Sequence, residues 1–293
     1  EEELRALMSD WGQPSFRAAQ IQSWLDNGCT SFSQMRNLPA PLRERLGDRY
    51  SIPGAAIRRK LVSKLDGTRK FLFGLEDGNA IESVFMKYKF GNSICVSSQA
   101  GCRMGCRFCA STIGGLKRNL TPGEIAGQIL AAQKQTGERI SHVVVMGTGE
   151  PFDNYENLAA FIRIINDRNG LDIGMRNITV STCGLAPKIA RFAEDFPQVN
   201  LAISLHAASD EMRSEIMPVN KTYPMETLLE ACKDYTEKTS RRITFEYTLV
   251  KGVNDSTEHA KMLASRLRGM LCHVNLIPLN KVEETGYDTT ERG

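Results

Sequence analysis

The chain has 293 residues, of which 41% are hydrophobic and 24% are charged. This composition is typical of a globular protein with one large domain, or with a large and a small one. No apolar run approaches the roughly 18 residues that a membrane helix needs, and the acidic start EEELRALMSDWG is no secretory signal, so we expect a cytoplasmic protein without membrane contact. The net charge of only +3 excludes a uniformly basic nucleic-acid binder but does not exclude local basic patches.

The first fifty residues carry helical patterns. A 3.6-residue spacing in SFRAAQIQSWLDNG predicts a helix that ends near Gly28. The apolar residues expected near one face of this helix are Phe16, Ala19, Ile21 and Trp24. The segment TSFSQMRNLPAPLRERLGDRY predicts two more short helices, divided at Pro39. Residues 1–52 are therefore expected to form a small helical accessory domain.

The pattern changes to short strands near Ile57. The runs IRRKLVSKL, TRKFLFGL and AIESVFMKY are strand-like, and they are joined at Asp66-Gly67 and Asp77-Gly78, dipeptides that strongly indicate hairpin turns. We expect a β-meander of about three strands over residues 53–92, which links the helical domain to the rest of the chain.

From Ser93 onward, strand-like and helix-like segments alternate. The expected strands are SICVSS, ISHVVVMG, NITVST, VNLAISL, RITFEYTLV and CHVNLIPL. The helical patterns between them include TPGEIAGQILAAQKQTG, NYENLAAFIRIIND, METLLEACKDYTEK and DSTEHAKMLASRLRG. This alternation predicts an α/β fold with parallel strands and crossover helices. About six units favour a partial (β/α)6 barrel over residues 93–283, although an open doubly wound sheet has the same signature.

Unusual polar residues follow the ends of the expected strands, which favours the barrel. They are the cysteine-rich loop, Gly149-Glu150, Ser181, His206 and Asn280. In an α/β barrel, the loops that follow the strands converge on one mouth. The sequence therefore predicts a functional site at that mouth.

Four of the eight cysteines are concentrated in CVSSQAGCRMGCRFCAST, residues 95–112. Cys102, Cys106 and Cys109 form a C-x3-C-x2-C array on the loop after the first expected parallel strand. Without a secretory signal, clustered thiols indicate metal binding or catalysis rather than disulfides. A zinc site usually has four ligands, often in two pairs, and no second pair follows here. Three thiolates instead suit an iron–sulfur cube with one iron open to a further ligand.

This C-x3-C-x-aromatic-C array resembles the hallmark of the radical S-adenosylmethionine (SAM) superfamily, whose members fold as partial α/β barrels. The resemblance implies that Cys102, Cys106 and Cys109 bind a 4Fe-4S cluster, whose open iron binds the amino and carboxylate groups of SAM. It also implies that one-electron reduction cleaves SAM to a 5′-deoxyadenosyl radical. The segment VVVMGTGEP is similar to the superfamily's GGEP-type motif, so Gly149-Glu150 is expected to meet the methionine amino group, a donor that requires an acceptor.

A narrower resemblance covers nearly the whole chain. The segments CVSSQAGCRMGCRFCAST, LTPGEIAGQIL, VVMGTGEPFDN, ITVSTCGLAP, LAISLHA, IMPVNKTYP, LVKGVND and VNLIPLN are together similar to the RlmN/Cfr family of RNA enzymes that methylate adenine carbons. The residues that this resemblance implies as SAM contacts are Gly149, Glu150, Ser181, Ser204, Leu205, His206 and Asn280. It also implies that Cys95 is a catalytic thiol and that Glu82 is a proton acceptor. Without the resemblance, Cys95 would be interpreted as a buried strand thiol and Glu82 as a solvated carboxylate.

The mechanism of this family uses a cysteine in a C-terminal tail. One SAM methylates that cysteine, and a second SAM yields the radical that activates the methyl group to add to the electron-poor adenine carbon. Loss of the ring proton to a base, and attack by a second thiol, then release methylated RNA and leave a protein disulfide. The resemblance implies Cys95 as the second thiol and Glu82 as the base, with Cys95 itself as the alternative base.

Residues 284–293 resemble only the start of that tail. No other cysteine of the chain stands in the matching context, so we expect the methyl-carrying cysteine beyond Gly293, in a GxDIxAxCGQL-like segment. As given, the chain is expected to bind the cluster and SAM but not to complete methylation.

The expected partners are RNA substrates and an electron donor. Carbon-2 members of the family act on 23S rRNA and tRNA, whereas carbon-8 members methylate the same ribosomal nucleotide and confer antibiotic resistance. The CAST that follows the cluster loop favours the carbon-2 group. The candidate phosphate contacts are Arg58, Arg59, Lys60, Arg69, Lys70, Lys87, Lys89, Arg103, Arg107, Lys117 and Arg118. We further expect a monomer that is reduced by a donor such as flavodoxin.

Two other classes of function are compatible with the same residues. A non-catalytic RNA-binding protein that keeps an iron–sulfur cluster would not cleave SAM. A radical enzyme that acts on a protein or a small molecule would cleave SAM without forming an RNA product.

Overall fold

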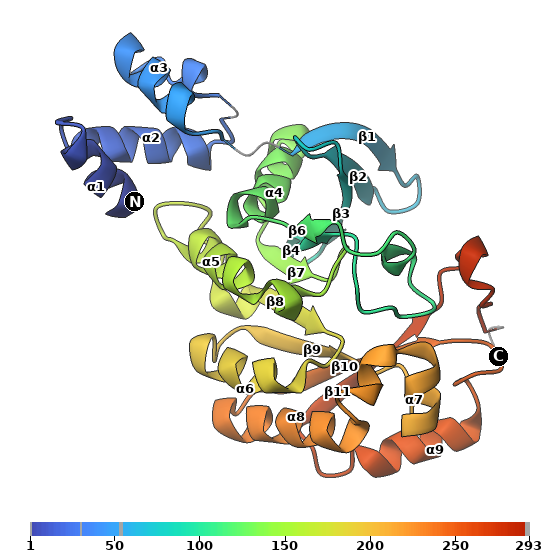
Figure 1. Cartoon of the computed structure of the whole chain (residues 1–293). Coiled ribbons are helices and arrows are strands. Elements are labelled where there is room, and N and C mark those ends of the chain that lie inside the picture. Colours follow the sequence, from blue (N-terminus) through green and yellow to red (C-terminus); the bar gives the residue numbers. More distant parts are fainter. Residues whose placement is uncertain (1, 30, 53–54, 291–293) are drawn as a thin grey trace.

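The computed structural model describes residues 2–29, 31–52 and 55–290. Its N-terminal part is helical, as expected, and has a hydrophobic core of its own that includes Met8, Ile21, Met35 and Leu46. The elements of this part are α1 (Glu2–Asp10), α2 (Phe16–Asp26), the 3-10 helix η1 (Phe32–Gln34) and α3 (Ala40–Arg49). Figure 1 shows these helices grouped at one end of the molecule, away from the parallel strands.

The apolar face predicted for α2 was wrong at two positions. Ala18 and Ile21 are buried, whereas Phe16 is 55% exposed and Ala19 is also exposed. Ala18, Ile21 and the partly buried Leu25 follow the same i, i+3, i+7 spacing that defines a helical stripe. The periodicity of α2 is therefore compatible with more than one face, and packing on the neighbouring helices selects this one.

One nine-stranded sheet runs through the rest of the chain. Its strands are β1 (Ala56–Val62), β2 (Arg69–Gly74), β3 (Ala80–Tyr88), β4 (Gly91–Cys95), β7 (His142–Val145), β8 (Ile178–Thr182), β9 (Asn200–Ser204), β10 (Ile243–Leu249) and β11 (Cys272–Pro278). Strands β1 to β4 pair antiparallel, and the six strands from β4 to β11 pair parallel. The expected meander is present as β1–β3, but it is continuous with the parallel sheet because β3 pairs with β4.

The order of the parallel strands identifies a partial barrel. They lie side by side in chain order, β4-β7-β8-β9-β10-β11. In a doubly wound sheet, by contrast, the strand order reverses at a switch point and helices cover both faces. Right-handed crossovers that always advance in one direction keep the helices on one side of the sheet. The expected α/β fold with a partial (β/α)6 barrel is confirmed.

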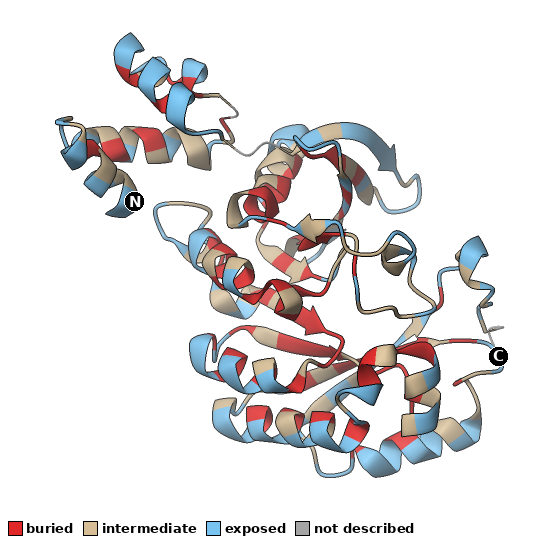
Figure 2. Ribbon diagram, in the orientation of Figure 1, coloured by how far each residue is buried: buried red, intermediate tan, exposed pale blue. Residues whose placement is uncertain are grey.

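The helices α4 (Pro122–Thr136), α5 (Tyr155–Asn166), α6 (Ala186–Asp195), α8 (Met225–Thr239) and α9 (Thr257–Arg266) cover the outer side of this sheet (Figure 1). The short helix α7 (Asp210–Ile216) lies instead near the carboxyl ends of the strands, where its Ile216 packs in a small cluster with Cys183. The buried faces of the covering helices, red in Figure 2, turn toward the strands, and Ile125, Phe161 and Phe192 join one core with the outward residues of the sheet. The sequence did not predict α6 and α7, which are short helices between strongly patterned strands. Helix α4 begins at a capping box formed by Thr121 and Glu124.

Several short elements complete the chain. A two-stranded ribbon pairs β5 with β6 beside the cysteine loop. The bounds are β5 (Gln99–Ala100), β6 (Arg118–Asn119), η2 (Ala110–Thr112), η3 (Pro151–Asn154), η4 (Met175–Asn177), η5 (Pro218–Lys221) and η6 (Glu283–Thr285). After η6 the chain turns back to the loop that follows β10, where Thr289 forms a bridge with Val250.

The predicted domain boundaries at residues 52/53, 92/93 and 283/284 stay predictions. Residues 53 and 54 lie outside the described residues, as do residues 291–293 of the predicted tail segment. In the part of the chain that the structure describes, no helix is both long and apolar enough to cross a membrane.

Candidate cofactor site

A cavity of about 240 Å³ lies at the carboxyl ends of β7, β8, β9 and β10, and we call it the thiol cavity. Its wall includes Cys102, Cys106, Phe108, Cys109, Gly149, Glu150, Ser181, Cys183, Ser204, His206 and Glu246. The structure thus brings the cysteine array together with Gly149-Glu150 and with residues that follow β8 and β9. This convergence agrees with the mouth that the sequence predicted for a barrel.

The three thiols of the array border the cavity as free cysteines. Burial raises the pKa of Cys102 to about 11 and that of Cys106 to about 12, so without a ligand both thiols are protonated at neutral pH. Binding of iron requires the thiolate form, and the metal must therefore displace these protons.

The arrangement of the donors fits a cluster better than a single ion. Within residues 2–29, 31–52 and 55–290, no three thiol, imidazole or carboxylate groups converge as one metal ion would require. The thiols of Cys102, Cys106 and Cys109 instead line one cavity together with Glu150 and His206. Three soft sulfur donors around an open volume suit an iron–sulfur cube that keeps one position for a second ligand.

Gly101 allows the cysteine loop to close on itself. Its φ is +75°, and a Cβ at this position would lie 1.9 Å from the carbonyl oxygen of Gly115. We expect Gly101→Ala to lower the free energy of unfolding by about 3 kcal/mol and to reduce iron incorporation, because both the backbone and the contact are strained. Gly115→Ala is the matched control: its φ is +63°, but no atom lies within 4 Å of the added Cβ, so it should cost only about 1 kcal/mol. Equal losses in urea unfolding would contradict this interpretation.

Glu150 places a buried carboxylate in the thiol cavity. Its side chain accepts backbone hydrogen bonds from Phe152 (3.0 Å) and from Cys183 (2.7 Å), and its own N–H donates to Gln99 Oε1 (2.8 Å). Among the described residues, no lysine, arginine or histidine forms an ion pair with Glu150, and burial raises its pKa. A ligand ammonium group would supply the missing positive charge, so the carboxylate fits the role that the motif implies.

Only some of the SAM contacts predicted at the ends of β8, β9 and β11 lie at the cavity. Ser181 and Ser204 line it, with their hydroxyl oxygens 3.4 Å apart. Leu205 is fully buried in the main core and does not line the cavity, because neighbouring residues of a strand point to opposite faces. Asn280 is exposed beyond β11 and does not line it either. Of these four predicted contacts, Ser181 and Ser204 line the cavity and Leu205 and Asn280 do not.

His206 presents a neutral donor to the cavity. The backbone N–H of Thr248 donates to Nδ1 (2.9 Å), which leaves the proton of the neutral ring on Nε2. Its ring packs edge-to-face on Phe108, the aromatic residue of the cysteine array, with centroids 5.0 Å apart. His206 also has a left-handed backbone, with φ of 55°, held by Asn254 Nδ2 donating to its carbonyl (2.7 Å).

The buried His206 predicts acid sensitivity. Burial lowers its pKa from 6.5 to about 3, with a further contribution from the charge of Arg213. Between these values the unfolded chain binds one more proton than the folded one, so stability present above pH 6.5 is lost as the pH falls toward 3, by about 1.4 kcal/mol per pH unit. His206→Gln, which cannot titrate here, should lose less stability over this window. Urea unfolding at several pH values measures the difference, and parallel curves would contradict the prediction.

Glu82 and Cys95 lie on β3 and β4, outside the wall of the thiol cavity. Val84 pairs with Cys95, and alternate residues of a strand share a face, so Glu82 and Cys95 lie on the same face of the sheet. Ile81 and Ser83 occupy the opposite face, where Ser83 Oγ donates to Gln128 Oε1 of α4 (2.6 Å). The face that carries Glu82 and Cys95 is therefore the one turned away from α4.

The surroundings of these two residues differ. Burial raises the pKa of the Cys95 thiol to about 11, and a hydrogen bond from the Met146 backbone opposes this only in part. Glu82 is half-exposed and forms an ion pair of 2.8 Å with Lys70. Cys95 is thus a protonated thiol at neutral pH, whereas Glu82 is a carboxylate within reach of solvent.

Three residues near the cavity were missed by sequence reasoning. Arg213 is fully buried, Cys183 lines the cavity beside Cys106, and Glu246 is a buried carboxylate whose Oε2 accepts from Asn275 Nδ2 (2.8 Å). A charged residue within the apolar run RITFEYTLV was the available signal for Glu246, because the strand is buried on both faces. The helix DEMRSEI, by contrast, has the pattern of a solvated segment and gave no signal for Arg213.

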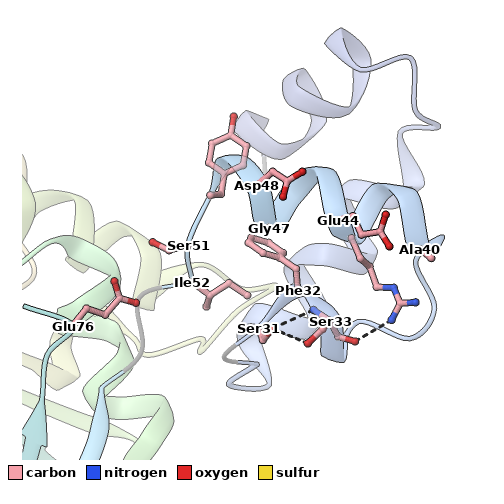
Figure 3. A pocket seen from close by; sticks show the side chains of 12 residues that line it. Ser31, Phe32, Ser33, Ala40, Glu44, Gly47, Asp48, Ser51, Ile52 and Glu76 are labelled. Atoms are coloured by element: carbon pink, nitrogen blue, oxygen red, sulfur yellow. Dashed lines mark hydrogen bonds between the residues drawn. The ribbon is translucent and has the colours of Figure 1, made fainter.

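A second hollow lies in the N-terminal part of the molecule (Figure 3). It is lined mostly by residues of η1 and α3, with Glu76 from the turn after β2, and Arg43 Nη1 donates to the Ser33 carbonyl (3.0 Å) beside it. None of the predicted site residues lines this hollow. The cysteine array and the strand-end residues therefore define the thiol cavity as the candidate site.

A partial barrel with three clustered thiols and a buried carboxylate at its mouth defines a radical SAM enzyme. The family model for the radical SAM superfamily matches residues 96–263, and the model for the ribosomal RNA large subunit methyltransferase N-terminal domain matches residues 1–52. The solved structure of a radical SAM methyltransferase from Sphaerobacter thermophilus superposes with a TM-score of 0.94 at 44% identity, over 99% of this chain and 86% of that one.

Curated relatives agree with both matches. Proteins named as probable dual-specificity RNA methyltransferases RlmN from Clostridium acetobutylicum and Clostridioides difficile are 54% and 52% identical to this chain. The alignments cover 99% and 100% of this chain, and 84% and 85% of the two relatives. The chain belongs to the RlmN family of radical SAM RNA methyltransferases.

Proposed function

We propose that this protein methylates carbon 2 of an adenine in 23S rRNA, at the peptidyl transferase centre, and in tRNA, in the anticodon loop. It uses a 4Fe-4S cluster and SAM, the cofactors of its superfamily. The observation that carries the proposal is the thiol cavity, where three cysteines and a buried carboxylate converge. The high identity of the whole chain to the dual-specificity relatives supports the choice of reaction and substrates.

The residues of the thiol cavity have distinct roles in this proposal. Cys102, Cys106 and Cys109 hold the cluster, which supplies, when bound, the electron that splits a carbon–sulfur bond of SAM. The Glu150 carboxylate accepts from the ligand ammonium group. The further SAM contacts in this proposal are Gly149, Ser181, Ser204 and the Nε2–H of His206. Leu205 and Asn280 do not line the cavity, so a contact between either residue and SAM would lie outside its wall.

Cys95 and Glu82 handle the thiol and proton steps. The raised pKa of Cys95 means that this thiol must lose a proton before it can act as a nucleophile, and it is a poor base in its resting form. Glu82 lies on the same sheet face and already carries a carboxylate within reach of solvent. We therefore assign the base role to Glu82, released from Lys70, and the role of the second thiol to Cys95.

RNA contacts are proposed at the rim of the mouth. Several of the candidate cations are already paired with acidic residues: Lys70 with Glu82, Lys87 with Glu138, Arg103 with Asp153, and Arg118 with Asp77 and Glu124. Arg107 and Lys117 belong to the exposed cations of the cysteine loop. We propose that these two cations contact the phosphates that flank an extruded adenine.

Lys87 and Lys89 lie at the other end of β4 from Cys95, near the turn that joins β3 to β4. They are therefore far less suited to contact the target nucleotide itself. We further propose that the protein acts in the cytoplasm as a monomer and that a small electron-transfer protein such as flavodoxin reduces the cluster.

Product analysis tests this function. Protein that carries the family's C-terminal cysteine is reconstituted anaerobically with iron and sulfide, reduced, and incubated with SAM and with 23S rRNA fragments or tRNA. Mass spectrometry of the digested RNA should detect 2-methyladenosine. A carbon-8 product would overturn the choice of carbon, and RNA binding without cleavage of SAM would favour the non-catalytic class.

A further inference from the structure

Arg213, on α7, is a fully buried arginine without a carboxylate partner. Its exposed fraction is 0%, and within the described parts of the chain no aspartate or glutamate forms an ion pair with it. An unpaired buried charge is costly unless its donors are all well occupied. Here Nη2 donates to the carbonyls of Cys183 (2.6 Å) and Ser204 (3.3 Å), Nε to the carbonyl of Leu205 (3.2 Å), and Nη1 to Asn220 Oδ1 (3.0 Å).

These three carbonyls belong to the ends of two adjacent strands. Cys183 follows β8, Ser204 is the last residue of β9, and Leu205 follows it. The guanidinium therefore joins the two strand ends from behind the cavity wall, and α7 (orange in Figure 1) delivers it there. A planar group with donors in fixed directions is suited to this task, since it defines both the distance and the relative orientation of the carbonyls.

The residues joined in this way adjoin the cofactor contacts. The Cys183 N–H donates to Glu150 Oε2 (2.7 Å), so a single residue, Cys183, links the guanidinium to the carboxylate of the GTGEP segment. Ser204 and His206, on either side of Leu205, both line the thiol cavity. Gly184 allows the close approach at Cys183: its φ is +106°, and an added Cβ would lie 3.2 Å from Arg213 Nη2 and 2.9 Å from Leu228.

The other end of the guanidinium is held from α7 and η5. Asn220 accepts from Arg213 and donates to Asp210 Oδ1 (2.8 Å) and to Ser214 Oγ (2.8 Å). Asp210 Oδ1 in turn accepts from the N–H of Met225 at the start of α8 (2.8 Å). Asn220 thus fixes the position of the Arg213 guanidinium on one side, and the guanidinium in turn binds the three strand-end carbonyls on the other.

We propose that Arg213 is a positioning residue of the cofactor site: its buried guanidinium holds the ends of β8 and β9 in register, so that Glu150, Ser204 and His206 face the three cluster thiols. This inference rests on the proposed use of SAM and a cluster.

The test compares Arg213→Met, Arg213→Lys and wild type after anaerobic reconstitution of the cluster. Methionine fills similar space without donors or charge, and lysine keeps the charge but offers only a point donor. Arg168→Met is the matched control, because Arg168 is exposed on the loop after α5. Iron content and thermal unfolding report folding, isothermal titration reports the Kd for SAM, and the electron paramagnetic resonance spectrum of the reduced cluster reports its response to SAM.

We expect Arg213→Met to raise the Kd for SAM by about 10- to 100-fold and to weaken the spectral response, as loss of a supporting hydrogen-bond partner typically does at metal sites. Arg213→Lys should recover part of the affinity, and Arg168→Met should match wild type. RNA affinity should be the same in all variants, since Arg213 is buried away from solvent. A merely structural role would lower the unfolding temperature but leave the Kd and the spectrum of the folded protein unchanged.

Folded, iron-loaded Arg213→Met with the wild-type Kd for SAM would overturn the inference. If this variant does not fold, Arg213→Lys decides: a wild-type Kd would overturn the inference, and a raised Kd would support it. The wild-type protein separates this question from the proposed function. Failure of wild type itself to bind SAM would refute the function, whereas normal binding by both wild type and variant would refute only the role of Arg213.

Discussion

Cys106→Ala is expected to abolish both cluster binding and SAM cleavage. Cys106 lies between Cys102 and Cys109 in the sequence, and all three cysteines line the thiol cavity. Loss of a hydrogen-bond partner of a metal ligand already costs about 10- to 100-fold in affinity or activity, so loss of the ligand itself should cost more. Iron and sulfide analysis after anaerobic reconstitution measures the first effect, and the yield of 5′-deoxyadenosine under reductant measures the second.

Cys272→Ala is a matched control for this experiment. Cys272 begins β11, is only partly buried and does not line the thiol cavity. The control should retain iron and SAM cleavage at the wild-type level. If Cys106→Ala retained iron and cleaved SAM, or if both variants lost iron equally, the assignment of the cluster to the C-x3-C-x2-C array would be wrong.

Cys95→Ala is expected to separate SAM cleavage from RNA methylation. Cys95 lies outside the wall of the thiol cavity, so its removal should leave iron content and SAM cleavage intact. Without the second thiol, the reaction should stop before methylated RNA is released, and formation of 2-methyladenosine should fall by at least about 100-fold. Mass spectrometry of digested RNA and chromatography of 5′-deoxyadenosine, on protein that carries the C-terminal cysteine, measure the two quantities side by side.

Cys232→Ala controls for the loss of a buried thiol. Cys232 is fully buried in α8, within the main core, and has no proposed role. It should lose some stability but retain both activities. Wild-type methylation by Cys95→Ala would refute the catalytic role of this thiol, and loss of iron from Cys95→Ala would indicate a structural role at the cluster instead.

The sequence alone determined the parts of this protein that depend on local chemistry. Asp66-Gly67 and Asp77-Gly78 indicate hairpin turns because glycine adopts the positive φ that such turns need, and both turns are present, with Gly67 at +72° and Gly78 at +86°. The six parallel strands and the cysteine array were likewise predictable, because strand patterning and ligand spacing are encoded within short segments.

The tertiary structure alone decided which residues after the strands reach the cavity. Ser204 lines it and Leu205 does not, because one step along a strand moves a side chain to the opposite face. No local pattern distinguishes Arg213, on a polar-looking helix, from a solvated arginine. Its burial follows from carbonyl groups that β8 and β9 bring together from positions 8 to 30 residues away in the chain. Such long-range convergence, and the electrostatic environment that it creates, arises only when the strands and helices of the partial barrel assemble around the site.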